Sequence, residues 1–348
     1  MRTFQCEVCN QTVYFENFVC GNCKTALGFN PSTLKMQALK EDATRALSTF
    51  VAPKGLEYCS NYQFNVCNWL VPAQSGESLC SSCSLNRTIP DLGVPGNTER
   101  WFEFEKAKRR LLYGLFRLRL PVNGINGEQP HTPLVFDILA DAPTGHESGV
   151  ITMNVSEADA SVREQIRTTF NEAYRTLLGH FRHEIGHYYW LMLVNNDRWI
   201  GRFRELFGDE TMDYASALTA YHQNGPRADW QQTHISAYAT SHPWEDWAES
   251  WAHYLHMVDA LETANSYAVA PRISSGRLMD TFWPQPLRDP YSAPSAKKLI
   301  DSWIPLSLAI NDLNRSMGHR DFYPFIISPP VIQKLEFIHT IIHSAKNR

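Results

Sequence analysis

The chain has 348 residues, of which 43% are hydrophobic and 12% aromatic. This composition supports a packed globular core and excludes a disordered protein. The net charge of −4 gives the chain no overall attraction to nucleic acid or to an anionic membrane surface. No window approaches the roughly 18 consecutive apolar residues of a membrane span, and the N-terminus lacks the apolar run of a secretory signal. We therefore expect a cytoplasmic protein without a membrane anchor.

All eight cysteines lie in the first 83 residues, which marks this part of the chain as a separate region. They form two groups with the spacings C-x2-C-x10-C-x2-C and C-x7-C-x12-C-x2-C. Two thiolates on a tight turn bind one side of a tetrahedral zinc, and a second pair completes the site. We predict one structural zinc in each group. The ligands are Cys6, Cys9, Cys20 and Cys23 in the first group, and Cys59, Cys67, Cys80 and Cys83 in the second.

Other uses of these cysteines stay open. The even number permits disulfides, although the reducing compartment that we expect disfavours them. A single iron would suit the first group, because zinc ribbons and rubredoxin-like sites share this geometry. Segments this short need a metal to fold, which favours a structural role. Binding of a protein partner through the ribbons is a further hypothesis.

Turn-forming residues at 86–97 form the predicted linker between a zinc-ribbon region at 1–90 and a second domain at 91–348. Within the first region, residues 28–58 include a stretch that favours a helix. Helical periodicity begins again near Thr98, and the basic cluster KAKRR at 106–110 is expected on a solvated face of that helix.

Two short strands are predicted at 133–139 and 149–154, and a helix is predicted from near Ser156 towards Trp190. Beyond Trp190 the pattern is mostly helical. The fold class that we predict is α+β, with a mostly helical second domain that carries a small sheet.

The stretch HEIGHYYW at 183–190 places His183 and His187 four residues apart, with Glu184 directly after the first histidine. On a helix, residues i and i+4 share a face, so both imidazoles can reach one ion. A chance HExxH is common enough that the motif needs a third ligand before it predicts a zinc enzyme. Gly186 costs a helix about 1 kcal/mol relative to alanine, which suggests that another backbone approaches it closely.

Two known spacings for the third ligand can be tested against the sequence. A metzincin would have glycine and histidine at the positions that Trp190 and Leu193 occupy, so this pattern is excluded. A thermolysin-like pattern would have a glutamate about twenty residues downstream and an aspartate four residues further on. Glu205 and Asp209 imitate that pattern and stay candidates.

A third candidate is the pair Glu245 and Glu249, which stand four residues apart among tryptophans. Carboxylates beside so much apolar surface are costly unless a cation or a hydrogen-bond donor satisfies them. A zinc ion would satisfy one carboxylate, and the second N–H of a ligand histidine would satisfy the other.

HEIGHYYW followed by YATSHPWEDWAESWAHYL resembles bacterial zinc-binding metallopeptidases that carry an N-terminal zinc-ribbon region, and the resemblance covers the whole chain. The catalytic part is similar to the gluzincins, especially the lethal-factor type, which has HExxH and then an E-x-x-A-E helix. In that type a catalytic tyrosine stands seven residues before the first glutamate, where this chain has Tyr238. The resemblance implies that Glu245 is the third zinc ligand and that Glu249 orients a ligand histidine. It also implies a zincin-like fold.

The ligands His183, His187 and Glu245 would leave the fourth position of a catalytic zinc to water. We predict a metallopeptidase that hydrolyses peptide bonds through a zinc-activated water, with Glu184 as the general base and Tyr238 as a donor to the oxyanion. Its partner is a peptide or protein substrate. An edge strand would pair with that substrate by β-addition. The strand residues are Val150, Ile151, Thr152, Met153 and Asn154.

Two other functions compete with this prediction. The first is a zinc-ribbon binding or adaptor protein whose metal site is vestigial, although such a site has no use for Glu184. The second is a SprT-like nucleic-acid-associated protease. That group uses a third histidine ligand, and the acidic balance of this chain adds no support, so we do not expect nucleic acid as a partner.

Overall fold

The structure is a computed structural model that describes residues 1–42, 49–52, 55–122, 133–169, 172, 175–271 and 287–345. The chain forms two compact units. Unit 1 comprises Met1–Phe116, Pro121–Thr169 and Arg175–Phe181, and unit 2 comprises Arg117–Leu120, Phe170–Tyr174 and Arg182–Arg348. No helix in the described part of the chain has the length and apolar character needed to cross a membrane. The boundary predicted at residue 90 stays a prediction.

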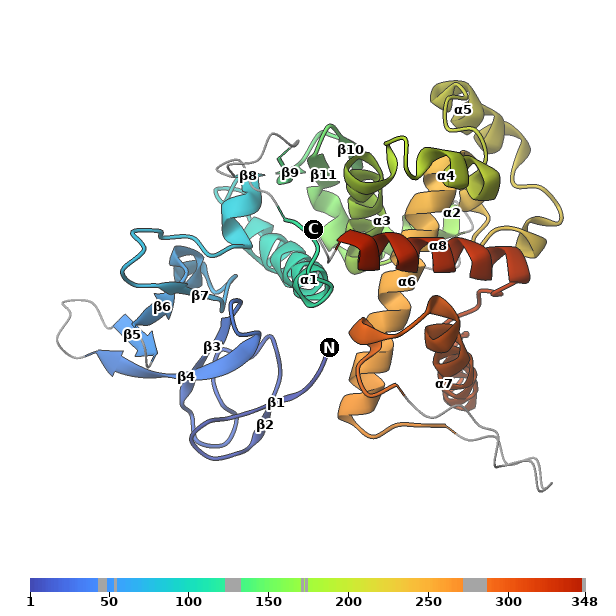
Figure 1. Cartoon of the computed structure of the whole chain (residues 1–348). Coiled ribbons are helices and arrows are strands. Elements are labelled where there is room, and N and C mark those ends of the chain that lie inside the picture. Colours follow the sequence, from blue (N-terminus) through green and yellow to red (C-terminus); the bar gives the residue numbers. More distant parts are fainter. Residues whose placement is uncertain are drawn as a thin grey trace, which may run out of the picture. The chain divides into compact units, whose positions relative to one another are not determined.

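Helices dominate the chain and the sheets are small, which confirms the predicted α+β class (Figure 1). The strands are β1 (Phe4–Gln5), β2 (Thr12–Val13), β3 (Ala26–Asn30), β4 (Lys35–Asp42), β5 (Thr49–Ala52), β6 (Leu56–Tyr58), β7 (Leu70–Pro72), β8 (Asn86–Thr88), β9 (Val135–Leu139), β10 (Gly145–Glu147) and β11 (Val150–Asn154). The α-helices are α1 (Asn97–Arg117), α2 (Ala160–Thr169), α3 (Leu177–Tyr189), α4 (Ile200–Phe207), α5 (Tyr214–Asn224), α6 (Pro243–Ser266), α7 (Ala296–Ser316) and α8 (Pro329–Ala345).

The cysteine-rich region is built from strands. β1 pairs with β2, and β3 to β7 form an antiparallel five-stranded sheet in chain order. The helix predicted within residues 28–58 is therefore wrong for the described part of that stretch; residues 43–48 and 53–54 lie outside it. Every residue of β3 is buried, and Leu39 of β4 packs with Leu70 of β7. Packing between strands outweighs the helix propensity of these residues.

Helix α1 begins within one residue of its predicted start, but its basic cluster does not lie on a solvated face. Lys108 and Arg109 are each 1% exposed. The Lys108 ammonium donates to Glu105 Oε1 at 2.7 Å, and the Arg109 guanidinium donates to the carbonyl of Val66. The expectation of a solvated face is wrong for these two residues, because specific partners compensate their burial.

Strands β9 and β11 confirm the two predicted strands, but β11 is not an edge strand. The sheet order is β10-β11-β9-β8, so β11 lies between β10 and β9. Ser148 and Gly149 join β10 to β11, and both have positive φ, as a tight two-residue hairpin requires. The prediction of an edge strand for substrate binding is therefore wrong, because β11 is an interior strand. Strand β10 pairs with the edge of β11 that a substrate would need. The residues of that predicted strand are Val150, Ile151, Thr152, Met153 and Asn154.

The helix predicted from Ser156 to Trp190 is two helices, α2 and α3, with non-helical backbone at 172 and 175–176 among the described residues. In unit 2, α6 packs against α4, α7 and α8 (Figure 1). The fully buried rings of Trp247 and Trp251 form the centre of this packing, and Trp247 contacts Phe207 and Phe337 with ring centroids 5.8 and 6.1 Å apart.

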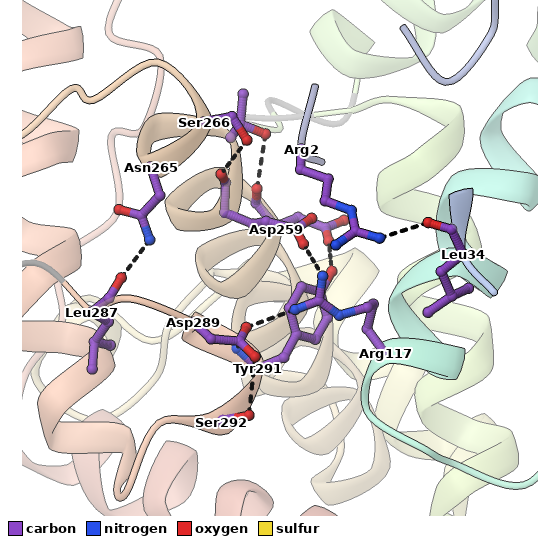
Figure 2. Close-up of polar contacts among 12 residues, drawn as sticks. Arg2, Leu34, Arg117, Asp259, Asn265, Ser266, Leu287, Asp289, Tyr291 and Ser292 are labelled. Carbon is purple, nitrogen blue, oxygen red and sulfur yellow. Dashed lines mark hydrogen bonds and ion pairs between the residues drawn. The ribbon is translucent and has the colours of Figure 1, made fainter. Parts of the chain in front are cut away.

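A polar network ties other segments of unit 2 to α6. The Arg182 guanidinium pairs with Asp259 of α6, and the Tyr291 hydroxyl donates to the same carboxylate. The Arg117 guanidinium lies 4.5 Å from the centre of the Tyr291 ring and donates to Asp289 at 2.7 Å (Figure 2). Since Arg182 directly precedes His183, this network holds the second half of α3 against α6.

Candidate metal centre

Helices α3 and α6 meet at Gly186. A Cβ atom at this position would lie 3.0 Å from the Cα of Ala248, so no larger residue fits without movement of the helices. The Trp247 indole N–H donates to the Gly186 carbonyl at 2.8 Å. The close backbone approach predicted at Gly186 is confirmed. It brings the HExxH face of α3 next to the first turns of α6.

The start of α6 places two carboxylates toward α3. His242 caps the helix, because its Nδ1 accepts the backbone N–H of Trp244 at 3.1 Å, and Pro243 occupies the first turn. Glu245 lies in this first turn, where the helix dipole stabilises a carboxylate, and it is 1% exposed. Glu249 follows one turn later on the same face.

The structure brings His183, His187 and Glu245 together, with one ligand atom of each within 4.8 Å of the others. His183 Nε2 lies 2.9 Å from Glu245 Oε2 and 3.3 Å from His187 Nε2. His187 Nε2 lies 3.6 Å from the other oxygen, Glu245 Oε1. Two imidazole nitrogens and a carboxylate are a donor set that zinc prefers.

Glu249 lies at the other ring nitrogen of His183. Its Oε1 lies 2.7 Å from His183 Nδ1, on the opposite side of the ring from Glu245. A proton on Nδ1, donated to Glu249, leaves Nε2 as an acceptor that faces Glu245 Oε2. Two acceptor atoms at 2.9 Å repel each other unless a proton or a metal cation lies with them. The arrangement therefore fits a cation bound among Nε2, Glu245 and His187.

The pKa shifts of His183 and Glu245 also favour a positive charge among these side chains. Burial of the His183 ring opposes its charged form, but hydrogen bonds to Glu245 and Glu249 outweigh burial and raise its pKa well above the ordinary value. Burial also opposes the charged form of Glu245, yet His187 and His183 hold the pKa of this carboxyl well below its usual range. The site stabilises positive charge next to buried negative charge.

The two predicted catalytic residues lie in the same unit as this group. Glu184 is 8% exposed and is not part of the ligand group, as its predicted role as a base requires. Tyr238 lies in a 3₁₀ turn (Tyr238–Thr240), with its ring centre 5.9 Å from that of His183. Burial and the charge of Glu245 raise the pKa of Tyr238 far above its ordinary value, so its hydroxyl stays protonated. Both roles stay predictions.

The thermolysin-like alternative is not assembled in the structure. The side chain of Glu205 is 64% exposed and pairs with Arg202 at 2.6 Å. Asp209 accepts the backbone N–H and the hydroxyl of Thr211. The metal-binding group in this part of the described chain includes neither carboxylate.

Sequence reasoning missed Tyr214, the first residue of α5. Its hydroxyl donates to Glu245 Oε1 at 2.6 Å. Tyr214 has no periodic relation to either motif, and it lies in the long segment between them. Only the fold brings it to the metal group.

The cysteine groups also have the geometry of metal sites. All eight cysteines are free, and the Sγ atoms of the pairs Cys6–Cys23, Cys9–Cys20 and Cys67–Cys80 are each 3.7 Å apart. Sulfurs bound about 2.3 Å from a tetrahedral zinc stand about 3.8 Å from one another, whereas a disulfide bond is about 2.05 Å long. The disulfide alternative is therefore excluded in this structure. All four cysteines of the second group are buried, while Cys9 and Cys23 of the first group are partly exposed.

Residues 97–341 match the model of a family described as "Putative zinc-binding metallo-peptidase", and residues 3–94 match a zinc-ribbon domain. The chain is 42% identical over 349 residues to an uncharacterized protein of Mycobacterium tuberculosis, an alignment that covers 98% of this chain and 95% of the relative. An uncharacterized protein of Mycobacterium bovis matches with the same identity and coverage. No solved structure matches. The chain belongs to this family of zinc-binding metallopeptidases and carries an N-terminal zinc ribbon.

Proposed function

We propose that this metallopeptidase is a gluzincin-type zinc enzyme whose metal is held by His183, His187 and Glu245. The observation that carries the proposal is the convergence of these three side chains, with Glu249 on the far nitrogen of His183. A vestigial site would have no reason to keep a fully buried carboxylate, Glu245, against one nitrogen of a histidine whose other nitrogen faces Glu249, because burial of a charge costs free energy.

When bound, zinc supplies a Lewis acid that polarises the scissile carbonyl and acidifies water. Glu184 takes a proton from the attacking water and returns it to the leaving amine. The Tyr238 hydroxyl donates a hydrogen bond to the carbonyl oxygen as negative charge develops there. Glu249 keeps His183 in the tautomer that presents Nε2. The substrate class is a peptide or a protein. The ribbon cysteines are not paired in disulfides, which suits the reducing cytoplasm that we propose for the enzyme.

A proteome-derived peptide library, digested by the full chain and by Glu184→Gln, tests this proposal. Glutamine keeps the size of the side chain but cannot accept the proton. We expect cleavage at defined bonds by the native protein and a loss of about 10²- to 10⁴-fold in the variant. Glu184 is not part of the ligand group, so the variant should keep its zinc.

The matched control is Glu205→Gln, the same change at an exposed glutamate in an ion pair with Arg202. It should cleave the same bonds at the native rate. Equal cleavage by native protein and Glu184→Gln would attribute the activity to a contaminant and contradict the proposal.

A further inference from the structure

We propose that Tyr214 is a positioning residue of the metal centre, which holds the Glu245 carboxylate through its Oε1 atom so that Oε2 faces His183. This inference rests on the proposed function, because it assigns a role toward the same metal. It concerns a residue outside the HExxH and E-x-x-A-E motifs.

The two oxygens of Glu245 have different neighbours. Oε2 lies 2.9 Å from His183 Nε2, whereas Oε1 accepts the Tyr214 hydroxyl at 2.6 Å and lies 3.6 Å from His187 Nε2. A hydrogen bond from a neutral hydroxyl to a carboxylate at this distance is short and strong. Tyrosine ordinarily titrates near pH 10, so the hydroxyl is a donor at neutral pH. Tyr214 therefore restricts rotation of a carboxylate that is 1% exposed.

His242 holds Tyr214 in place from the start of α6. Its Nδ1 accepts the Trp244 N–H, so the proton of a neutral ring is on Nε2, which donates to the carbonyl of Met212 at 3.2 Å. The Tyr214 ring packs edge-on against the His242 ring, with centroids 5.2 Å apart, and lies 5.9 Å from the Trp244 ring. The residue that caps α6 thus also fixes the backbone two residues before Tyr214.

The surroundings of the hydroxyl support a role at the metal site over one in packing alone. Tyr214 is partly exposed, yet its hydroxyl donates to the buried carboxylate of Glu245 at 2.6 Å. A tyrosine kept only for packing would not need its hydroxyl directed at a carboxylate of the metal-binding group. The neighbouring Tyr221, also on α5, contacts the Tyr238 ring at 5.7 Å. It offers a matched control.

The test measures zinc affinity of the histidine site by competition with a chromophoric chelator on the full chain, with the cysteine sites left loaded. Tyr214→Phe removes only the donor and keeps the ring packing. We expect zinc binding about 10- to 100-fold weaker, as for loss of other groups that orient a ligand. The absorption spectrum of the Co²⁺-loaded site should also change, whereas Tyr221→Phe should alter neither quantity.

The variant His242→Asn tests whether His242 affects zinc binding by holding Tyr214 in place. Asparagine still caps a helix, but its side chain is too short to reach Met212 as well. We expect it to weaken zinc binding in the native background and to add little in the Tyr214→Phe background. Fully additive losses would show that His242 acts independently, and would overturn its assignment as the residue that holds Tyr214.

Glu245→Ala separates this inference from the proposed function. If Glu245→Ala abolishes tight zinc binding and Tyr214→Phe binds zinc like the native protein, the role of Tyr214 is wrong and the ligand set stands. If Glu245→Ala itself keeps native affinity, the ligand set is wrong, and the inference fails with it.

Discussion

His183 faces a different carboxylate from each of its ring nitrogens, 2.9 Å to Glu245 and 2.7 Å to Glu249. We expect the two carboxylates to have different roles, one in binding the metal and the other in orienting His183. A group that binds a metal determines whether the ion is held at all, while a group that orients a ligand changes how strongly it is held. The two glutamates, one turn apart on one helix, should therefore differ sharply when each is removed.

Glu249→Ala should weaken zinc binding at the histidine site about 10- to 100-fold and leave the site present. The expected loss of affinity has a physical cause: the variant lacks the carboxylate that accepts the Nδ1 proton of His183 and so fixes its tautomer. Equilibrium zinc titration of the full chain measures this, with Glu205→Ala as the control that should bind zinc normally. A larger loss for Glu205→Ala than for Glu249→Ala would move the centre to the thermolysin-like spacing.

Tyr238→Phe should keep the fold, the zinc and a near-native KM, while kcat falls about 10²- to 10³-fold. The hydroxyl can donate to the oxyanion only as charge develops, so its benefit lies in the transition state. Steady-state kinetics on a peptide cleaved by the native protein measure both constants, on the condition that chemistry limits turnover. Near-native kcat would remove Tyr238 from the catalytic residues.

At the scale of elements, the centre depends on how closely α3 and α6 approach. Gly186 permits this approach, and the Trp247 indole N–H satisfies its carbonyl across the contact. Glycine is a poor helix former, so its presence in α3 reflects this contact and not local helix stability.

Gly186→Ala should destabilise the protein by about 1–3 kcal/mol, because the added methyl meets the backbone of Ala248. Gly201→Ala, at an exposed position of α4 where the new Cβ meets no atom within 4 Å beyond its own helix backbone and chain neighbours, should instead stabilise the protein by up to about 1 kcal/mol. Urea unfolding of both variants measures the opposite signs. Stabilisation by Gly186→Ala would mean that the helices do not approach as described.

Other elements show where local sequence patterns mislead. The stretch that includes β4 favours a helix by propensity, yet it forms a strand because its partners β3 and β5 lie on either side. Lys108 and Arg109 look like surface residues, yet they are buried because Glu105 and the Val66 carbonyl accept their hydrogens. The sequence suggests that β11 is an edge strand, but β10 pairs with its outer edge. In each case the structure depends on a contact with residues that the local sequence pattern does not include.

At the scale of the whole molecule, metal content is the simplest global test. Each of the two cysteine groups and the histidine group brings its ligand atoms within 4.8 Å of one another. Elemental analysis of the gently purified chain should find about three zinc ions, and the double variant His183→Ala/His187→Ala should lose about one. A double variant that keeps the full complement would contradict the assignment of the histidine site.

Spacing within a single helix or turn was enough to predict several features from the sequence alone. His183 and His187, like Glu245 and Glu249, share a helix face because of their separation in the chain, and the cysteine pairs lie on short turns for the same reason. Gly186 was predicted to adjoin another backbone because its local cost needed a compensating contact. The metallopeptidase family was predicted from the resemblance of HEIGHYYW and YATSHPWEDWAESWAHYL to its members, not from spacing.

Contacts between distant segments were decided only by the tertiary structure. Glu245 and Glu205 both stand at plausible separations from His187, and only the packing of α6 on α3 brings one of them to the histidines. Tyr214 reaches Glu245 because His242 binds the backbone beside it, a relation that no spacing encodes. The physical reason is range: helix periodicity determines neighbours within about one turn, whereas burial and hydrogen bonding select among distant partners only after the chain has folded.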